Sequence, residues 1–254
     1  MDVARSSDVG DGDEKALREA NLAYRWPGLY DLMGEGDGVV GGVVGILRAA
    51  GCRPRRLLDL GCGTGRHLAE LVARLGVDVV GVDLQEQLVE YGRRRYGVEL
   101  LVGDMRSVRL ERAFDVITCL GNSLAYLRSE DEVEAALATA AVHAGEGAVV
   151  IISTLMQPLP EMSRRELRVE NDLVTASVEV ESYWDAVDGV QITERRWVHD
   201  RGGVDRDLLR RRVIGVDVLT EMLLRVGFVR VAIADSGGVV GPARTTDEFV
   251  VAFC

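Results

Sequence analysis

The chain has 254 residues, of which 47% are hydrophobic, and a formal net charge of −11. This acidic balance argues against nucleic acid as a partner, because nucleic-acid binding draws on a basic surface. No window approaches the length of a membrane span and the first residues contain no apolar run typical of a signal peptide, so we expect a cytoplasmic protein with no membrane partner.

The first fifty residues (1–50) are predicted to form a flexible N-terminus and a helical cap. Residues 1–13 are predicted to be disordered and residues 14–24 to be helical. Five glycines between positions 34 and 42 predict a mobile segment that leads into an apolar helix. Three aromatic side chains gather in this region of a chain that is only 5% aromatic: Tyr24, Trp26 and Tyr30. They are either core residues or a lid over a cationic or planar ligand, since aromatic faces attract cations.

Strand and helix patterns alternate over residues 51–155, which predicts a parallel sheet with helices on both faces. The predicted strands are 56–60, 77–82, 98–102, 114–120 and 147–153. The predicted helices are 66–75, 85–96 and 130–142, and Ser129 and Glu132 have the spacing of a capping box at the start of the last one. Ligands of such sheets bind at the carboxyl ends of the strands, so we expect the site there.

The alternation stops over residues 156–212, which predict an antiparallel insertion. Residues 175–184 and 190–199 alternate as strands do and are joined through Asp188-Gly189, a good hairpin sequence, while 207–214 is a candidate third strand. The core resumes over residues 213–254 with a helix at 218–226. Two strands close the chain, 228–234 and 248–253. No helix lies between them, so we expect them to be antiparallel.

A glycine-rich turn links the first predicted strand to its helix, where residues 59–65 read D-L-G-C-G-T-G. Dinucleotide-binding loops have the spacing G-x-G-x-x-G, whereas this loop has G-x-G-x-G and an acid, Asp59, two residues before the first glycine. The spacing disfavours a nicotinamide dehydrogenase and favours a ligand that carries an amino group. It resembles motif I of the class I S-adenosylmethionine-dependent methyltransferases, in which the loop packs against the methionine part of the cofactor. The alternative is a glycine-rich turn with no ligand.

Acidic residues also follow the second and third predicted strands. Asp83 stands about twenty residues past the glycine loop, where a carboxylate can accept hydrogen bonds from two ribose hydroxyls. Asp104 and Met105 fit an adenine contact, the carboxylate accepting from the exocyclic amine and the thioether lying over the ring. The alternatives are a helix cap for Asp83 and a plain turn for Asp104. The succession of Asp59, Asp83 and Asp104 at neighbouring strand ends is a more specific indication of this cofactor site than any one of these residues alone.

The segment after the fourth strand sharpens the resemblance. Residues 119–127 read C-L-G-N-S-L-A-Y-L and look like the corresponding stretch of glycine N-methyltransferases and amino-sugar N,N-dimethyltransferases. Those families are also similar in the Leu29-Tyr30-Asp31 element and in an antiparallel insertion after the fifth strand. The resemblance implies an α/β, Rossmann-like class I methyltransferase fold with a seven-stranded, mostly parallel sheet and a reversed last strand. A histidine often stands at the position of Tyr126 in the amino-sugar enzymes, and this departure speaks against an amino-sugar substrate.

Carried over residue by residue, the resemblance implies S-adenosyl-L-methionine as cofactor and S-adenosyl-L-homocysteine as product. Leu120 and Gly121 would line the methionine side, and Tyr30 would close over the cofactor near the reacting methyl. Tyr30 and Tyr126 are the catalytic candidates. The predicted cofactor-binding residues are Tyr30, Asp59, Gly61, Cys62, Gly63, Gly65, His67, Asp83, Leu84, Gly103, Asp104, Met105, Leu120, Gly121 and Asn122.

Neither a base for a hydroxyl acceptor nor a metal-binding pattern is evident. No H-E-x-x-H motif occurs and the four cysteines form no C-x-x-C pair, so we predict no metal and reduced thiols. We expect His67 and His143 to be structural and treat His199 as a candidate for substrate contact. Glu179, Glu181 and Tyr183 share one face of an insertion strand and are either attractants for a cationic amine or solvated charges.

These patterns predict a small-molecule methyltransferase that acts at an amine nitrogen, with the acceptor between core and insertion. Methyl transfer needs alignment and exclusion of water, and an amine needs only to arrive deprotonated. The alternatives are an O-methyltransferase of natural-product metabolism and a cofactor-binding subunit without activity. The acceptor is the expected partner, and a homodimer is one assembly that the sequence allows.

Overall fold

The computed structural model describes residues 21–33, 38–160, 162–170, 174–235 and 248–254. The disorder predicted for residues 1–13 and most of the helix predicted over 14–24 lie outside these ranges. The described N-terminal elements are two short helices, α2 (Leu22–Arg25) and α3 (Pro27–Met33). Of the segment that we predicted to be mobile, Gly38 is the N-cap of helix α4 (Val39–Ala49), so the glycines at 41 and 42 are helical and that part of the prediction is wrong.

A seven-stranded sheet with the order β10-β11-β5-β4-β1-β2-β3 forms the core. Strand β11 pairs antiparallel with both of its neighbours, β10 and β5, and the other pairings are parallel. This arrangement confirms the predicted mostly parallel sheet with a reversed last strand. The strands are β1 (Arg56–Leu60), β2 (Asp78–Asp83), β3 (Glu99–Val102), β4 (Phe114–Cys119), β5 (Ala144–Ile152), β10 (Arg230–Asp235) and β11 (Glu248–Phe253).

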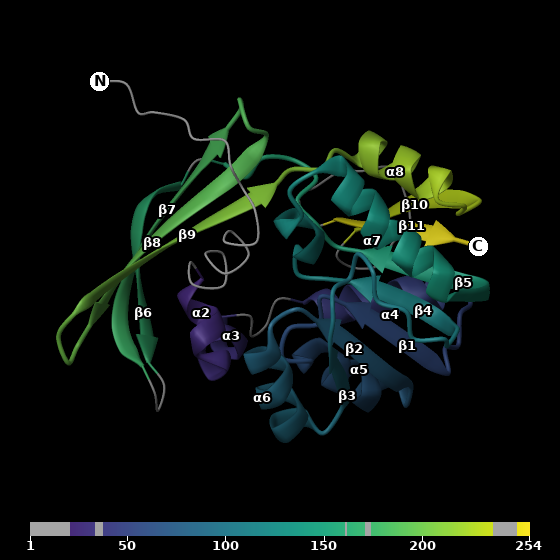
Figure 1. The fold of residues 1–254 in the computed structure, drawn as a ribbon, viewed down its shortest axis with the longest axis horizontal. Helices are drawn as coiled ribbons and strands as arrows, with labels where there is room; N and C mark the ends of the chain where they lie inside the picture. Colours follow the sequence, from purple (N-terminus) through teal and green to yellow (C-terminus); the bar gives the residue numbers. More distant parts are fainter. Residues whose placement is uncertain (1–20, 34–37, 161, 171–173, 236–247) are drawn as a thin grey trace.

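Helices cover both faces of this sheet (Figure 1). On one face, α4, α5 (Arg66–Leu75) and α6 (Glu86–Tyr96) bury apolar side chains against the strands. On the other face, α7 (Glu130–His143) and α8 (Val216–Arg225) form a second apolar layer. A short 3₁₀ helix, η1 (Ser123–Tyr126), lies at the carboxyl end of β4. The alternation of buried strand and amphipathic helix was readable because each element presents a local period.

The insertion is a separate four-stranded antiparallel sheet, β6-β7-β8-β9. It comprises β6 (Met162–Glu170), β7 (Thr175–Asp185), β8 (Val190–His199) and β9 (Val204–Arg212). The predicted hairpin is present, and Gly189 adopts the positive φ of 66° that its turn requires. The sequence did not predict β6, because five of its nine residues are charged and no alternation is visible. The strand predicted over 207–214 begins three residues earlier, at Val204.

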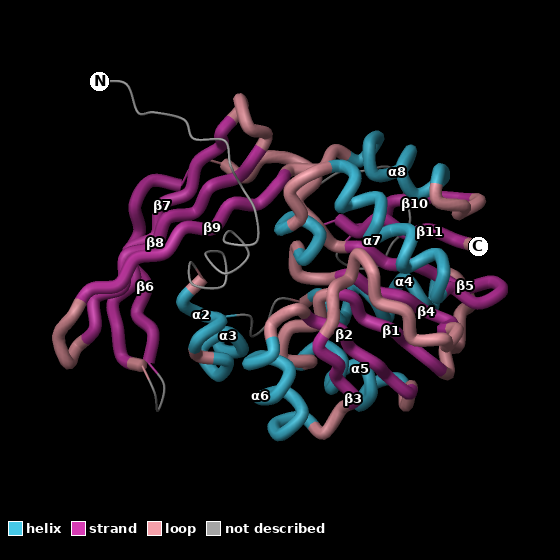
Figure 2. The backbone as a smooth tube through the Cα atoms, in the orientation of Figure 1, coloured by secondary structure: helices cyan, strands magenta, loops and turns pink. Residues whose placement is uncertain are grey.

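The N-terminal helices lie between the insertion and the core (Figures 1 and 2). Leu22 of α2 and Leu29 of α3 are buried in a cluster with Trp197, Val178 and other residues of the insertion sheet. The inner face of the insertion therefore packs on the N-terminal helices. Within the described ranges, no helix combines the length and apolar character needed to cross a membrane.

Candidate active site

A cavity of about 270 Å³ lies where the carboxyl ends of β1 to β4 face the N-terminal helices and strand β9. The predicted site residues that line it come from six separate segments. They are Tyr30, Gly61, Asp83, Leu84, Gly103, Asp104, Met105, Gly121 and Tyr126. The other predicted residues are not among its lining residues: Asp59, Cys62, Gly63, Gly65, His67, Leu120 and Asn122. The cavity is also lined by Tyr24, which we singled out as a core or lid aromatic, and by Glu132, for which the sequence predicted only a capping role. Arg106, Arg128 and Leu209, which the sequence did not single out, line it too.

The glycine loop leaves no space for side chains. Gly61, Gly63 and Gly65 all have positive φ, at 79°, 57° and 76°. A Cβ at Gly61 would lie 2.5 Å from Cβ of Ser123, and one at Gly63 would lie 2.9 Å from Cε1 of Tyr30. Both the backbone conformation and the close neighbours therefore require glycine. The ring of Tyr30 lies directly against this loop.

Asp83 ends β2 and lies on the cavity wall. Its Oδ2 accepts a hydrogen bond from the backbone N–H of Gly63 at 2.7 Å, and its Oδ1 accepts one from Gln85 at 2.8 Å. Burial raises the pKa of this carboxyl, while the two N–H donors act in the opposite direction. The N-cap of α6 is Gln85, so Asp83 is not the helix cap that we kept as the alternative. Its bond to Gln85 holds the turn before the helix and, with the Gly63 bond, fixes the carboxylate at the cavity edge.

Asp59 is buried beneath the same loop. It is 1% exposed, and Thr118 Oγ1 donates to its Oδ1 at 2.7 Å. Burial raises the pKa of Asp59 to about 7, against the smaller opposing influences of the Thr118 hydrogen bond and of His67. Asp59 is therefore an acid whose charge changes near neutrality, separated from the cavity by the loop.

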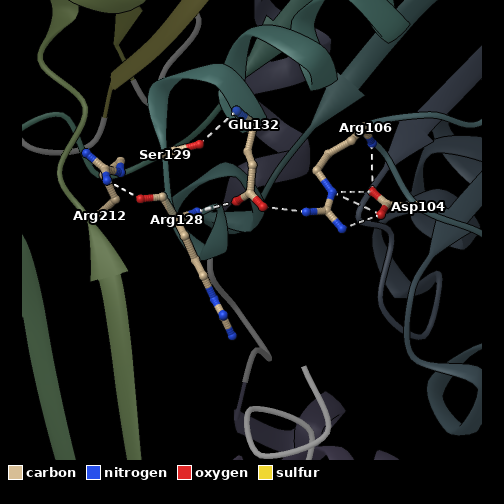
Figure 3. A network of polar contacts seen from close by, with 6 residues as sticks. All are labelled: Asp104, Arg106, Arg128, Ser129, Glu132 and Arg212. Carbon is tan, nitrogen blue, oxygen red and sulfur yellow. Dashed lines mark hydrogen bonds and ion pairs between the residues drawn. The ribbon is translucent and has the colours of Figure 1, made fainter. Parts of the chain in front are cut away.

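Asp104 is part of a polar network that the sequence did not reveal (Figure 3). Arg106 donates to both carboxylate oxygens of Asp104, and its Nη1 lies 2.5 Å from Oε1 of Glu132. The other oxygen of Glu132 accepts from the backbone N–H of Arg128 at 2.6 Å, and Arg212 donates to the Arg128 carbonyl. Burial tends to raise the pKa of Asp104, but the Arg106 hydrogen bonds outweigh it and hold the pKa below its usual value.

This network joins the loop after β3 to the start of α7 and to the end of β9. Ser129 is the N-cap of α7 and accepts from the N–H of Glu132 at 3.2 Å, as the capping box predicted. The Glu132 carboxylate, however, reaches the N–H of Arg128 rather than that of Ser129. Sequence spacing predicted a capping role for this glutamate, but it could not predict the ion pair with Arg106.

Three tyrosines from three elements meet at the cavity: Tyr24 of α2, Tyr30 of α3 and Tyr126 of η1. The rings of Tyr24 and Tyr30 lie 5.8 Å apart. Burial raises the pKa of both Tyr24 and Tyr30 well above the ordinary value, and the neighbouring Tyr126 contributes to raising the pKa of Tyr24. These two phenols are therefore neutral near pH 7, so they offer hydrogen bonds and aromatic faces but no phenolate base.

Asp31 fastens α3 to the core. Thr64, in the glycine loop, donates to its Oδ1, and the hydroxyl of Tyr96 on α6 donates to its Oδ2 at 2.6 Å. Asp31 is 7% exposed, so these contacts are shielded from water. They hold the neighbouring Tyr30 against Gly63.

The remaining aromatic and histidine candidates lie elsewhere. Trp26 contacts the rings of Trp197 and His199 and belongs to the packing between α2 and the insertion. His199 pairs with Asp205 at 2.8 Å and does not line the cavity. His143 is buried at the end of α7, where it bonds the carbonyl of Thr139 and accepts from Leu110 N–H, which confirms a structural role. His67 lies in the first turn of α5 beside Arg66.

Glu179, Glu181 and Tyr183 do not line the cavity either. Glu179 pairs with Arg196, and Tyr183 donates to Glu194. These residues lie on the face of the insertion sheet opposite the one that packs on the N-terminal helices. The interpretation as solvated strand charges fits these positions, and the attraction of an amine into the cavity does not. Among the described residues, no group of three or more histidine, cysteine, aspartate or glutamate side chains has an arrangement that could hold a metal ion.

The sequence is similar to known methyltransferases. Residues 57–147 match the family model described as "Methyltransferase domain". The chain is 34% identical over 111 residues to a dTDP-3-amino-3,4,6-trideoxy-alpha-D-glucopyranose N,N-dimethyltransferase from Streptomyces venezuelae, covering 43% of this chain and 46% of that protein. It is 36% identical over 113 residues to a dTDP-4-amino-2,3,4,6-tetradeoxy-D-glucose N,N-dimethyltransferase from Saccharopolyspora spinosa, covering 44% and 45%. The chain thus spans less than half the length of these curated relatives.

Solved structures extend the similarity of fold over the whole chain. The sugar N-methyltransferase KedS8 from a Streptoalloteichus species superposes with a TM-score of 0.75 at 24% identity, covering 100% of this chain and 98% of that one. The S-adenosylmethionine-bound amino pentose methyltransferase CalS10 from Micromonospora echinaspora gives 0.70 at 24% identity, covering 98% and 99%. These neighbours confirm the predicted class I methyltransferase fold, and the family model confirms the predicted resemblance.

Proposed function

We propose that this chain, with its methyltransferase domain, is an S-adenosylmethionine-dependent enzyme that methylates an amine nitrogen of a small molecule. One observation carries the proposal: Asp83, Asp104, Met105 and neutral tyrosines line a single cavity at the carboxyl ends of β1 to β4. The family match and the N-methyltransferase relatives support the same activity.

The cavity residues fit the chemistry of this cofactor. Asp83 offers a carboxylate fixed by two backbone donors, which suits a pair of ribose hydroxyls. Met105 supplies an apolar side chain for adenine beside Asp104. Gly121 lines the cavity, and a Cβ there would meet nothing within 4 Å, so glycine leaves this wall open for a ligand. Asp59, Gly63 and the other predicted residues beneath the lining act by holding the loop in shape.

When bound, S-adenosylmethionine supplies an electrophilic methyl group on a sulfonium whose thioether leaves without the help of an acid. The chain contributes alignment and exclusion of water. Tyr30 covers the glycine loop, and Tyr24 and Tyr126 form the wall on the side of β9. Their aromatic faces and hydroxyl groups suit a cationic or amine-bearing ligand.

The same residues favour nitrogen over oxygen as the acceptor. A hydroxyl acceptor needs a base, and an amine can lose its proton to water before the reaction. Burial keeps Tyr24 and Tyr30 protonated, and no histidine is among the cavity-lining residues in the described part of the chain. O-methylation of a natural-product hydroxyl is the second candidate, since a carboxylate such as Glu132 also lines the cavity.

An amino sugar linked to a nucleoside diphosphate is the first acceptor to test, because the sequence relatives carry such substrates in their names. The tyrosine at position 126, where the amino-sugar enzymes often carry a histidine, speaks against this acceptor. We further propose a reducing, cytoplasmic setting, in keeping with four cysteines that are all free. A homodimer stays a prediction, to be measured by sedimentation.

The purified chain should transfer methyl groups from S-adenosylmethionine to members of a panel of amines, including dTDP-3-amino-3,6-dideoxyglucose, and not to a matched panel of phenols and alcohols. Turnover of phenols alone would support the O-methyltransferase. Binding of S-adenosylhomocysteine without turnover of any acceptor would support a subunit without activity. Failure to bind S-adenosylhomocysteine would refute the cofactor itself.

A further inference from the structure

A buried ion pair lies on the inner face of the insertion sheet, outside the predicted site. Arg195 of β8 and Asp207 of β9 stand opposite one another in register. They are 6% and 7% exposed, and Arg195 Nε donates to Asp207 Oδ1 at 2.8 Å. A second bond joins Nη2 to Oδ2, and the guanidinium lies over the ring of Trp197 at 5.3 Å.

Trp197 Nε1 also donates to Asp207 Oδ1 at 3.3 Å, and two further hydrogen bonds of this pair are directed at helix α2. Asp207 Oδ2 accepts from the backbone N–H of Leu22 at 2.9 Å, and Arg195 Nη2 donates to Asn21 Oδ1 at 2.7 Å. Asn21 is the N-cap of α2 and also accepts from the N–H of Ala23 at 3.1 Å. The ion pair thus satisfies the first turn of a helix that has only four residues.

Stability of the sheet alone gives little reason for a charge pair in this place. Removing two charges from water carries a large desolvation penalty, and apolar residues of similar volume often serve a core equally well. What the pair adds is geometry, because its directed bonds fix where α2 begins. In the same turn, α2 presents Tyr24 to the cavity, where its ring lies 5.8 Å from that of Tyr30 and where Tyr126 is another lining residue.

Leu22 of α2 and Leu29 of α3 are both buried against the insertion sheet, but the polar contacts of the two helices run to different sides. The insertion holds α2 through Arg195 and Asp207, and the core holds α3 through Asp31 with Thr64 and Tyr96. Tyr24 is thus set by the insertion, and Tyr30 by the loop that the cofactor is proposed to touch. We propose that Arg195 and Asp207 are positioning residues that hold Tyr24 at the acceptor end of the cavity, a role that rests on the proposed methyltransferase function.

The test is the double variant Arg195→Met with Asp207→Leu, which leaves no single charge buried. Its matched control is Arg168→Met with Asp200→Leu, which removes a doubly bonded ion pair of the same sheet that is half exposed and does not contact α2. Hydrogen–deuterium exchange reports on residues 21–26 and 27–33 separately, calorimetry gives the Kd of S-adenosylhomocysteine, and steady-state kinetics with dTDP-3-amino-3,6-dideoxyglucose give KM and kcat.

We expect exchange over residues 21–26 to become at least about tenfold faster in the Arg195/Asp207 variant, while 27–33 and β7 stay protected and the Kd stays within about threefold. KM should rise about tenfold with kcat changed less than about threefold, and Tyr24→Phe should raise KM without faster exchange. The control should match the wild type in each measurement.

Unchanged exchange over 21–26 would overturn the proposal, as would faster exchange with an unchanged KM. Loss of protection in both helices together with β7 would show general destabilisation in place of positioning. A wild-type chain that fails to bind S-adenosylhomocysteine would refute the proposed function, and exchange would still decide whether the pair holds α2. A wild-type chain that binds it but does not turn over this amino sugar would count against the substrate, and therefore also against the acceptor-positioning role.

Discussion

Replacement of Asp83 by asparagine tests the cofactor site most directly. Asp83 accepts from two backbone N–H groups, one on each carboxylate oxygen. The amide of asparagine keeps one acceptor and turns the other into a donor that faces an N–H. The variant therefore loses one bond to the loop and the charge that favours bonds from ribose hydroxyls.

The size of the effect follows from these contacts. A hydrogen bond to a charged group contributes about 1.5–3 kcal/mol, so losing one to the ligand weakens binding about 10–150-fold. The loss of the Gly63 or Gln85 bond adds a smaller penalty by loosening the loop. We expect calorimetry with S-adenosylhomocysteine to show a Kd raised by at least about tenfold.

Asp115 provides the matched control. It is a carboxylate at the opposite end of the parallel sheet, and its Oδ2 likewise accepts from two backbone N–H groups, those of Arg55 and Arg56, at 2.6 and 2.9 Å. Both bonds of Asp115 end on the same oxygen, so the amide oxygen of Asp115→Asn can keep them and the variant removes only the charge. Asp115→Asn should leave the Kd unchanged. An Asp83→Asn affinity within threefold of wild type, or an equal loss in both variants, would refute the ribose assignment.

Three further predictions use other parts of the structure. Glu132→Gln should weaken S-adenosylhomocysteine binding about threefold to tenfold by loosening Arg106, whereas Glu134→Gln, which loses only a surface ion pair on the same helix, should not. Gly92→Ala should lower Tm, because its Cβ would lie 2.0 Å from the carbonyl oxygen of Thr64, while Gly41→Ala in open space should raise Tm slightly. Asp59 has a folded-state pKa of about 7, above an unfolded value near 4, so the folded state binds more protons between these values and the free energy of unfolding should fall as pH rises from about 4 to 7. Asp59→Asn, which can keep the Thr118 bond, should flatten that decline in urea titrations, and an equally steep decline would contradict the assignment.

The parts of the fold that sequence predicted well are those with a local signal. Strands β1, β8 and β11 were predicted to the residue because apolar runs or alternation lie between clear breakers. The reversed last strand followed from the lack of a helix between two strand patterns. Strand β6 was missed because its charged residues hide any period, although in the sheet it pairs with β7 over most of its length.

The candidate site divides in the same way. Asp83, Asp104 and the glycines follow successive strands at regular distances, so their meeting at one edge could be predicted from topology alone. The bonds of Arg195 to Asn21 and of Leu22 to Asp207 join residues 174 and 185 positions apart. No local spacing predicts such a contact, and in the sequence Arg195 and Asp207 look like ordinary charges of a solvated strand.

The two ends of the cavity are built by different parts of the chain, which bears on the identity of the substrate. The end of the cavity at which we propose that the cofactor binds is built by short connections within the core. The other end is built by Tyr24, Tyr126 and Leu209, which come from α2, η1 and β9. Their relative placement depends on side-chain contacts between the insertion, α2 and η1, including the Arg195–Asp207 pair and the Arg212 bond to Arg128. We expect substitutions at those contacts to reshape the proposed acceptor end while leaving the glycine loop and Asp83 untouched. Chains that share the loop can therefore differ in acceptor, and the contacts made by β8 and β9 are the place to look for the cause.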